Sequence, residues 1–166
     1  LTPLGSARKT AKAIGYPPEE YLAFYERLLD RVLALNARGV PMRERGAAIL
    51  LAKILHGTDP GFTDLRSPCG ASVGQLAYDH DGAVYTCDEG RMLAAEGDRL
   101  FLVGNVHETR YEDAVRHPTT KACQVASHLE GQPVCSRCAY RPYCGVCPAY
   151  NYAAQDTIWG RMGTND

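Results

Sequence analysis

Apolar residues in the first third of the chain recur at helical spacing. Between residues 15 and 41 they return every three or four positions, as expected for one face of an α-helix. The prolines at 17–18 suit the start of this helix, and Gly39 suits its end. A second helix is predicted over 43–55. The first predicted stripe consists of Tyr21, Tyr25, Leu28, Leu29, Val32 and Leu35. Ordinary packing accounts for both stripes.

The pattern changes after residue 59 from helical spacing to alternation. Apolar and polar residues alternate over 72–79 and 83–88, which predicts two strands. The sequence His-Asp-Gly at 80–82 separates them, and an Asp-Gly step between such segments favours a tight turn. The two strands are therefore predicted to form a β-hairpin, with a further short strand over 100–105.

The last third of the chain predicts short helices and then a stretch with no periodicity. The helices are expected over 111–117 and 119–129, and the aperiodic stretch covers 135–148. These elements predict an α+β fold: a helical lead-in over 1–60, then a small β-hairpin, loop-rich domain with short helices over 61–166. Because little apolar sequence surrounds 135–148, we expect a bound metal to order it.

Composition and charge narrow the functional class. The chain has 166 residues, enough for one core and an appendage, and 45% of them are hydrophobic. Eighteen Lys and Arg against nineteen Asp and Glu leave no basic excess, so no nucleic-acid partner is expected. The longest apolar stretch, Gly46–Leu55, is about half of a membrane span, so no membrane partner is expected either. The chain starts at Leu1 with no secretory signal, which favours a cytoplasmic fragment of a longer protein.

Seven cysteines carry the strongest chemical signal. They are Cys69, Cys87, Cys123, Cys135, Cys138, Cys144 and Cys147. Without a secretory signal, clustered cysteines favour metal binding over disulfides. The last four form two Cys-x2-Cys pairs that only five residues separate, whereas zinc ribbons place roughly 15–20 residues between their pairs. Short gaps, with Pro148 directly after the final cysteine, are more typical of iron–sulfur ligation.

The complete cysteine spacing resembles a known domain. It runs Cys-x12-Gly-x4-Cys, a gap, then Cys-x2-Cys-x5-Cys-x2-Cys. This pattern is similar to the SPASM region, the auxiliary-cluster domain that follows the barrel in radical SAM maturases of peptides and proteins. The segments CGASVGQLAYDHDGAVYTCDEGRML and CAYRPYCGVCPAYNYAAQ most resemble the His-Xaa-Ser system maturases and the anaerobic sulfatase-maturating enzymes. On this resemblance, residues 1–60 correspond to the end of the barrel and a connector.

The resemblance implies two [4Fe–4S] clusters as cofactors. It assigns Cys69, Cys87 and Cys147 to the first cluster. It assigns Cys135, Cys138 and Cys144 to the second cluster.

Two departures from the family pattern leave ligands open. Some relatives supply a fourth ligand of the first cluster from a cysteine shortly after the first one, but here that stretch is GASVGQL. Either one iron is open or Cys123 closes the site, although its helical spacing with Ala126 also fits a buried apolar position. The family's final cysteine is also absent, and we expect it beyond Asp166, with Asp166 itself as a weaker substitute.

The resemblance implies an accessory role in a larger enzyme. The chain has no Cys-x3-Cys-x2-Cys motif for the cluster that cleaves S-adenosylmethionine, so we assign it no catalytic and no S-adenosylmethionine-binding residue. Its clusters would relay electrons or bind the substrate, and its partners would be that peptide or protein and the parent's barrel domain. The alternative is a structural zinc-binding interaction module with one ion on the last four cysteines, for example after aerobic preparation. A thiol–disulfide oxidoreductase is disfavoured, because neither pair opens a helix after a buried strand.

Several aromatic residues surround the last cysteines in the sequence. We expect them to pack over the metal and exclude water. They are Tyr140, Tyr143, Tyr150, Tyr152 and Trp159.

Overall fold

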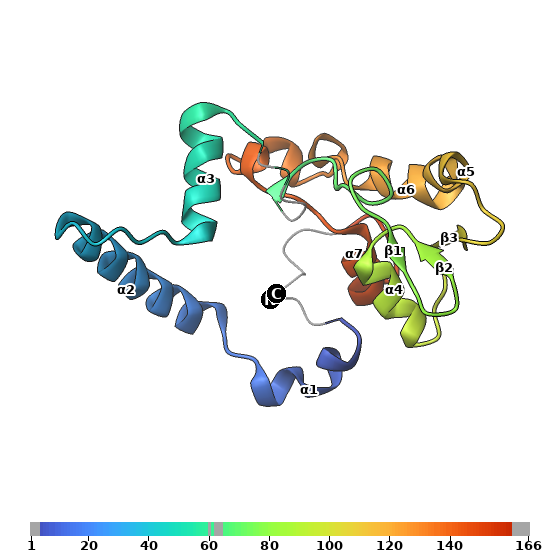
Figure 1. The fold of residues 1–166 in the computed structure, drawn as a ribbon, viewed down its shortest axis with the longest axis horizontal. Coiled ribbons are helices and arrows are strands. Elements are labelled where there is room, and N and C mark those ends of the chain that lie inside the picture. The colour runs from blue at the N-terminus through green and yellow to red at the C-terminus, as the bar shows by residue number, and fades with distance from the viewer. Residues whose placement is uncertain (1–3, 60, 62–64, 161–166) are drawn as a thin grey trace. The chain divides into compact units, whose positions relative to one another are not determined.

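The computed structural model describes residues 4–59, 61 and 65–160 (Figure 1). The chain divides into two compact units. One is Ala7–Pro60, and the other combines Leu1–Ser6 with Gly61–Asp166. The described residues form seven α-helices and a small three-stranded antiparallel sheet, so the predicted α+β class is confirmed.

The first unit is helical, as the apolar spacing predicts. Its helices are α1 (Ser6–Ile14), α2 (Pro18–Ala37) and α3 (Arg45–His56). Helices α2 and α3 begin and end within two residues of the predicted positions, whereas α1 was not predicted. Glu44 caps α3, since its carboxylate accepts hydrogen bonds from the first N–H groups of that helix. Within α2 the predicted stripe is partly confirmed, because Val32 is buried while Tyr21 is exposed.

The sheet of the second unit is the predicted hairpin with a third strand added. Strands β1 (Ala77–Tyr78), β2 (Ala83–Tyr85) and β3 (Leu102–Asn105) lie in that order and pair antiparallel. Gly82 adopts a φ of +82° in the turn, a conformation that glycine reaches without strain and other residues reach rarely. The hairpin prediction and the third strand are therefore confirmed.

The predicted strand over 72–79 is wrong in its first half. The carbonyl of Gly70 accepts hydrogen bonds from the N–H groups of residues 73, 74 and 75, which closes a turn there. Only β1 at the far end of this segment pairs with β2. Alternating apolar and polar residues can therefore occur in a turn as well as in a strand. The backbone hydrogen bonds show which of the two has formed.

In the described part of the second unit, four helices and three complete 3₁₀ turns accompany the sheet. The helices are α4 (Asp88–Ala95), α5 (Tyr111–Arg116), α6 (Pro118–Ala126) and α7 (Pro148–Gln155). The turns are η2 (Leu129–Gly131), η3 (Cys135–Arg137) and η4 (Arg141–Tyr143). The two short helices predicted before the aperiodic stretch are confirmed as α5 and α6, whereas α4 and α7 were not predicted.

The second unit has an apolar core between α4, α6 and α7, and a second, smaller apolar cluster joins β2, β3 and α5. Helices α4 and α7 lie side by side (Figure 1), and both follow directly after a cysteine. The buried core residues are Leu4, Ala71, Cys87, Leu93, Phe101, Cys123 and Ala149. Two of these seven are cysteines, so thiols are built into the core of this unit.

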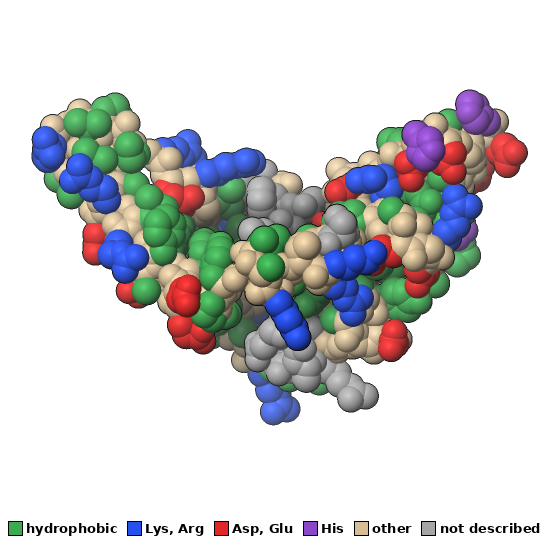
Figure 2. Space-filling model, turned by 90° about the horizontal axis from the view of Figure 1, so that it is seen from below, with side chains coloured by type: hydrophobic (Ala, Val, Ile, Leu, Met, Phe, Trp, Pro, Cys, Tyr) green, Lys and Arg blue, Asp and Glu red, His purple; other side chains and the backbone are tan. Residues whose placement is uncertain are grey.

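Two properties of the described residues bear on possible partners: the distribution of charge on the surface and the apolar character of the helices. On the face drawn in Figure 2, the described Lys and Arg side chains are interspersed with acidic and apolar ones. Among the described residues, no helix combines the length and the apolar character that crossing a membrane requires.

Candidate metal centre

Four cysteines from distant parts of the sequence meet around the core of the second unit. Cys87 and Cys123 are buried core members, and Cys69 and Cys147 are partly buried and packed against the same cluster. We call these four the buried cysteine group. The structure thus brings together the three cysteines predicted for the first cluster, and it adds Cys123 to them.

Cys87 and Cys147 occupy equivalent positions at the start of two helices. The Cys87 Sγ accepts a hydrogen bond from the N–H of Gly90 at 3.4 Å, at the N-terminus of α4. The Cys147 Sγ accepts one from the N–H of Tyr150, also at 3.4 Å, at the N-terminus of α7. Free N–H groups and the helix dipole at such an end favour a negatively charged sulfur. Both cysteines are therefore suited to bind a cation as thiolates.

Burial opposes ionisation of these thiols when no cation is bound. It raises the pKa of the Cys147 thiol to about 12 and that of Cys87 even further, despite the N–H donors. Burial is also the main reason that the pKa of Cys123 rises to about 12, with the nearby Cys69 as the next cause. A metal that binds such thiols replaces their protons and removes this penalty, so metal binding and folding are coupled.

Cys69 is fixed by the loop that leads into the sheet. Its N–H donates to the Ser127 Oγ at 3.0 Å, and Ser127 lies at the C-terminus of α6. The N–H of Leu129 donates in turn to the Ser67 Oγ at 3.1 Å. These two hydrogen bonds join segments about 60 residues apart in the sequence and place Cys69 beside α6.

The remaining three cysteines form a second, more open group. Cys135 is buried within η3, Cys138 follows that turn and is partly buried, and Cys144 is exposed after η4. The pKa of Cys135 is raised by burial first and then by Cys144 and Cys138, so the three thiols lie near one another. We call them the loop cysteine group. It contains the residues that the sequence assigns to the second cluster.

The described residues give no support to a single-ion zinc site. Among them, no three His, Cys, Asp or Glu side chains converge on a point where one metal ion would bind. A zinc ion requires its sulfurs at about 2.3 Å from one centre. Cys147 also belongs to the buried group, so the four-cysteine zinc site of the alternative hypothesis would have to draw it away from that core. Asp166, the weak substitute ligand, lies outside the described residues.

Sequence reasoning missed two polar residues that position the buried cysteines. Thr86 and Ser127 are completely buried, and each has a hydroxyl that contacts a cysteine. It also missed α4 and α7, although Asp88 and Glu89 in the first turn of α4 and Pro148 at the start of α7 were available signals.

The prediction that aromatic residues cover the metal segment holds for only part of the set. Tyr150 and Tyr152 pack against the core, and Tyr152 meets Phe101 edge to face with ring centroids 5.8 Å apart. Tyr140 and Trp159, in contrast, are 74% and 45% exposed. The prediction is wrong for these two, because both side chains are exposed to solvent.

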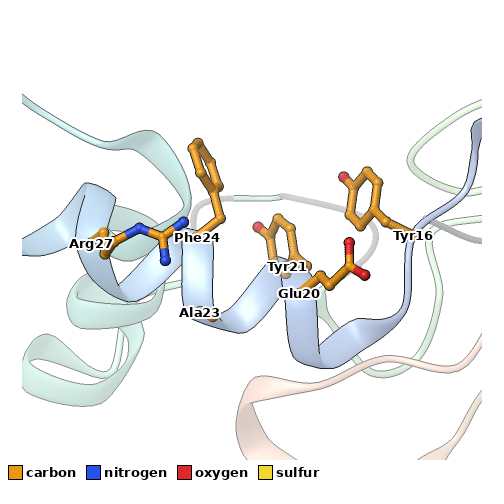
Figure 3. Close-up of a pocket in the computed structure, with 6 residues that line it drawn as sticks. All are labelled: Tyr16, Glu20, Tyr21, Ala23, Phe24 and Arg27. Carbon is orange, nitrogen blue, oxygen red and sulfur yellow. The ribbon is translucent and has the colours of Figure 1, made fainter.

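A separate hollow lies on α2 in the first unit. It has a volume of about 560 Å³, and Figure 3 shows its aromatic side chains standing on one side of the helix. The rings of Tyr16 and Tyr21 stack with centroids 6.2 Å apart, and Tyr25 extends the stack. The hollow is lined by Tyr16, Glu20, Tyr21, Ala23, Phe24 and Arg27, none of which belongs to either cysteine group.

Comparison with known proteins gives structural likeness only. No protein-family model matches the sequence, and no curated protein matches it. Two solved structures are similar: hexahistidine-tagged anSMEcpe with bound AdoMet, and native anSMEcpe with bound AdoMet, both of an anaerobic sulfatase-maturating enzyme, a radical SAM maturase. Their TM-scores are 0.63 and 0.62, at 19% and 18% identity. The matches cover 86% of this chain but only 35% and 38% of those chains, so the chain spans about a third of their length.

Proposed function

We propose that this chain is the iron–sulfur-binding C-terminal part of a radical SAM maturase that modifies a ribosomal peptide or protein. The observation that carries the proposal is the separation of the cysteines into two groups. Residues distant in sequence, Cys69, Cys87 and Cys147, gather in one core, while Cys135, Cys138 and Cys144 gather in one loop. This is the division that the SPASM-like spacing assigns to two [4Fe–4S] clusters. The fold similarity to a sulfatase-maturating enzyme supports the same function.

The donor chemistry of both groups suits iron–sulfur clusters. Such clusters are held by cysteine thiolates, and each iron of a [4Fe–4S] cluster takes one of them. The thiolates therefore surround a body of several atoms and do not converge on one ion. The thiols of the buried group lie beside one apolar core, and this grouping supports the proposal.

In this proposal the residues of the chain hold, tune and shield the clusters. The clusters, when bound, supply one-electron transfer. Gly90 and Tyr150 donate their N–H groups to the sulfurs of Cys87 and Cys147, and hydrogen bonds to ligand sulfur help to set a cluster's reduction potential. Phe101 and its apolar neighbours keep water from the buried group. The exposed side of the loop group at Cys144 faces solvent or a partner.

The proposal includes a division of labour along the chain. Residues 61–166 form the auxiliary-cluster domain, and residues 1–60 form the end of the barrel and the connector of the parent enzyme. The partners are the parent's radical SAM domain and its peptide or protein substrate, in the cytoplasm. The chain itself binds no S-adenosylmethionine, since the motif for the cleaving cluster is not among its residues.

Metal analysis of the chain tests this proposal first. Protein purified without oxygen should contain iron and acid-labile sulfide in equal amounts, with the broad visible absorption of iron–sulfur clusters and little zinc. Zinc without sulfide, persisting after reconstitution with iron and sulfide, would replace the proposal with the structural zinc module.

Two cysteine variants test the assignment to separate clusters. Cys87→Ala combined with Cys147→Ala should remove about half of the iron, and Cys135→Ala combined with Cys138→Ala should remove the other half, because each double variant leaves one cluster with too few thiolates to hold it. Ser136→Ala, which lies between Cys135 and Cys138 but removes no thiol, should keep all of it. Loss of all iron from either cysteine variant, with the control intact, would contradict the two-cluster assignment.

A further inference from the structure

We propose that Cys123 is the fourth thiolate ligand of the first cluster, so that every iron of that cluster has a ligand from this chain. The inference rests on the proposed function and deepens it, because it decides whether the first cluster can bind a substrate directly. It departs from the family pattern, in which such a ligand comes from just after the first cysteine, in the segment that reads GASVGQL here.

Cys123 is linked to Cys69 through the end of α6. The backbone carbonyl of Cys123 accepts a hydrogen bond from the N–H of Ser127 at 3.0 Å. The Oγ of Ser127 then accepts one from the N–H of Cys69, also at 3.0 Å. Ser127 itself is fully buried. Two short bonds to one residue thus hold Cys123 and Cys69 on the same side of the core.

Cys123 is linked to Cys87 through Thr86. The hydroxyl of Thr86 lies 3.6 Å from the Cys87 Sγ, and the same side chain interacts with the thiol of Cys123. Thr86 is fully buried, and its N–H donates to the Phe101 carbonyl at 3.1 Å, which fixes its backbone. Thr86 therefore lies near both thiols.

Three other thiols lie in or against the apolar cluster that contains Cys123. Cys123 is 2% exposed and shares the apolar cluster with Cys87, while Cys69 and Cys147 pack against that cluster. Together they supply four thiols beside one apolar cluster, and four is the number of donors in a complete [4Fe–4S] site. Each thiol gives up its proton when it binds iron. The positive charge of the iron then compensates the negative charge of the thiolate.

Glu89 is the competing candidate for the open position. It lies in the first turn of α4, and its charge acts on both Cys87 and Cys147. It is only half-buried, and carboxylate is a much less common cluster ligand than thiolate. Glu89→Gln therefore serves as the matched control, because it removes the rival charge and leaves Cys123 in place.

A closed cluster has a functional consequence. An iron with three sulfides and one thiolate has no position for a substrate atom. The first cluster would then pass electrons, and peptide binding through an open iron would be left to the second cluster or to none. The structure places the more exposed loop cysteine group where such contact is sterically easier.

Mild oxidation distinguishes open from closed clusters in the intact chain. Ferricyanide takes one electron from a [4Fe–4S]²⁺ cluster, and a cluster with an iron that lacks a thiolate then releases that iron as Fe²⁺ and leaves a [3Fe–4S]⁺ centre. Electron paramagnetic resonance counts these centres. The loop group has three cysteines in this chain and serves as the internal reference. We expect about one [3Fe–4S] centre per chain in the unmodified protein and about two in Cys123→Ala.

Two conservative variants separate ligation from packing. Cys123→Ser keeps an oxygen that can bind iron, so its count should stay near that of the unmodified chain. Cys123→Val keeps apolar volume without a ligand, so it should behave like Cys123→Ala. Glu89→Gln should leave the count unchanged. Circular dichroism confirms that each variant remains folded, and the count in the unmodified chain tests the proposal even if a variant does not fold.

Three results would overturn the inference. They are about two centres in the unmodified chain, an unchanged count in Cys123→Ala, or a count that Cys123→Val restores and Cys123→Ser does not. The proposed function fails differently, since the unmodified chain would then contain no acid-labile sulfide and no oxidation signal at all.

Discussion

The two cysteine groups differ in what holds them in place. The buried group is fixed by a strand, three helix termini and an apolar core, and polar contacts at Thr86 and Ser127 align it. The loop group is carried by the 3₁₀ turns η3 and η4, and one of its thiols is exposed. Both groups use cysteine, but the four thiols of the first lie in or against the apolar core, whereas in the second only Cys135 is buried.

This difference indicates two ways of building a metal site. A site with a preformed core can order its thiols before the metal binds, so the metal adds stability to an existing arrangement. A site in a loop has few packed contacts to offset the chain entropy, so the metal must supply most of the order. Under the proposed function, the buried group would follow the first route and the loop group the second.

Removal of the metal should have the largest effect on local stability, and this effect should differ between the two cysteine groups. Without metal, residues 133–146 should lose nearly all protection from amide hydrogen exchange, because their order depends on the cluster. The strands β2 and β3 should keep part of theirs, since they pair with each other and contribute to the core. Exchange followed by mass spectrometry, before and after chelation, measures both. Equal loss in the two regions would contradict the distinction.

Gly90→Ala should selectively weaken the buried group. An added Cβ would lie 2.6 Å from the Cβ of Phe101, so α4 would have to move, and the N–H that Gly90 donates to Cys87 would move with it. Overpacking of this kind costs about 1–3 kcal/mol of unfolding free energy. Gly131→Ala is the control, because its new Cβ would meet only Trp159 at 3.9 Å. Denaturant unfolding measures the unfolding free energy of both variants. Equal losses would contradict a specific effect of the Gly90 position.

Thiol reactivity should separate the two groups in the metal-free chain. Burial raises the pKa of Cys123 and Cys147 to about 12, so at pH 8 both remain protonated and shielded. Because thiolate is the reactive form, they should be alkylated at least about a hundredfold more slowly than the exposed Cys144. Their rates should increase as the pH rises toward 12. Peptide mapping after timed alkylation measures each rate, and similar rates would show that the buried group is not preformed.

Of these changes, Tyr152→Phe should lower the stability least. Its effect should be limited to the surroundings of the buried group. The Tyr152 hydroxyl donates to the Asp98 carboxylate at 2.7 Å, and this bond is the main cause of its raised pKa. The folded state therefore favours the protonated phenol, so the stabilisation is present below the ordinary pKa of about 10 and disappears as the pH rises through the raised value.

Thermal unfolding at pH 7 and above pH 11 measures this effect. We expect Tyr152→Phe to lower the midpoint at pH 7 by no more than about 2 °C, and by less at the higher pH. Tyr78→Phe, at an exposed position, should leave the midpoint unchanged at both. A larger difference at high pH than at pH 7 would contradict the assigned role of the hydrogen bond.

Local sequence signals predicted the elements that local forces form. Apolar spacing and proline positions located α2 and α3, and an Asp-Gly turn located the hairpin. Helices α4 and α7 escaped because a cysteine caps each of them, and cysteine is not among the usual N-cap residues. The prediction of a strand over 72–79 was wrong in its first half, because the Gly70 carbonyl closes a turn there.

The sequence by itself indicated which chemistry to expect of this protein. Thiols at these spacings, without a secretory signal, favour metal over disulfides, and the spacing alone proposes which cysteines act together. Only the tertiary structure decided that Cys123 joins them, because its neighbours Ser127 and Thr86 reach cysteines that are far away along the chain. The spacing of the cysteines along the chain gives information only about contacts within one segment. The environment of a buried thiol depends on which distant segments pack against it.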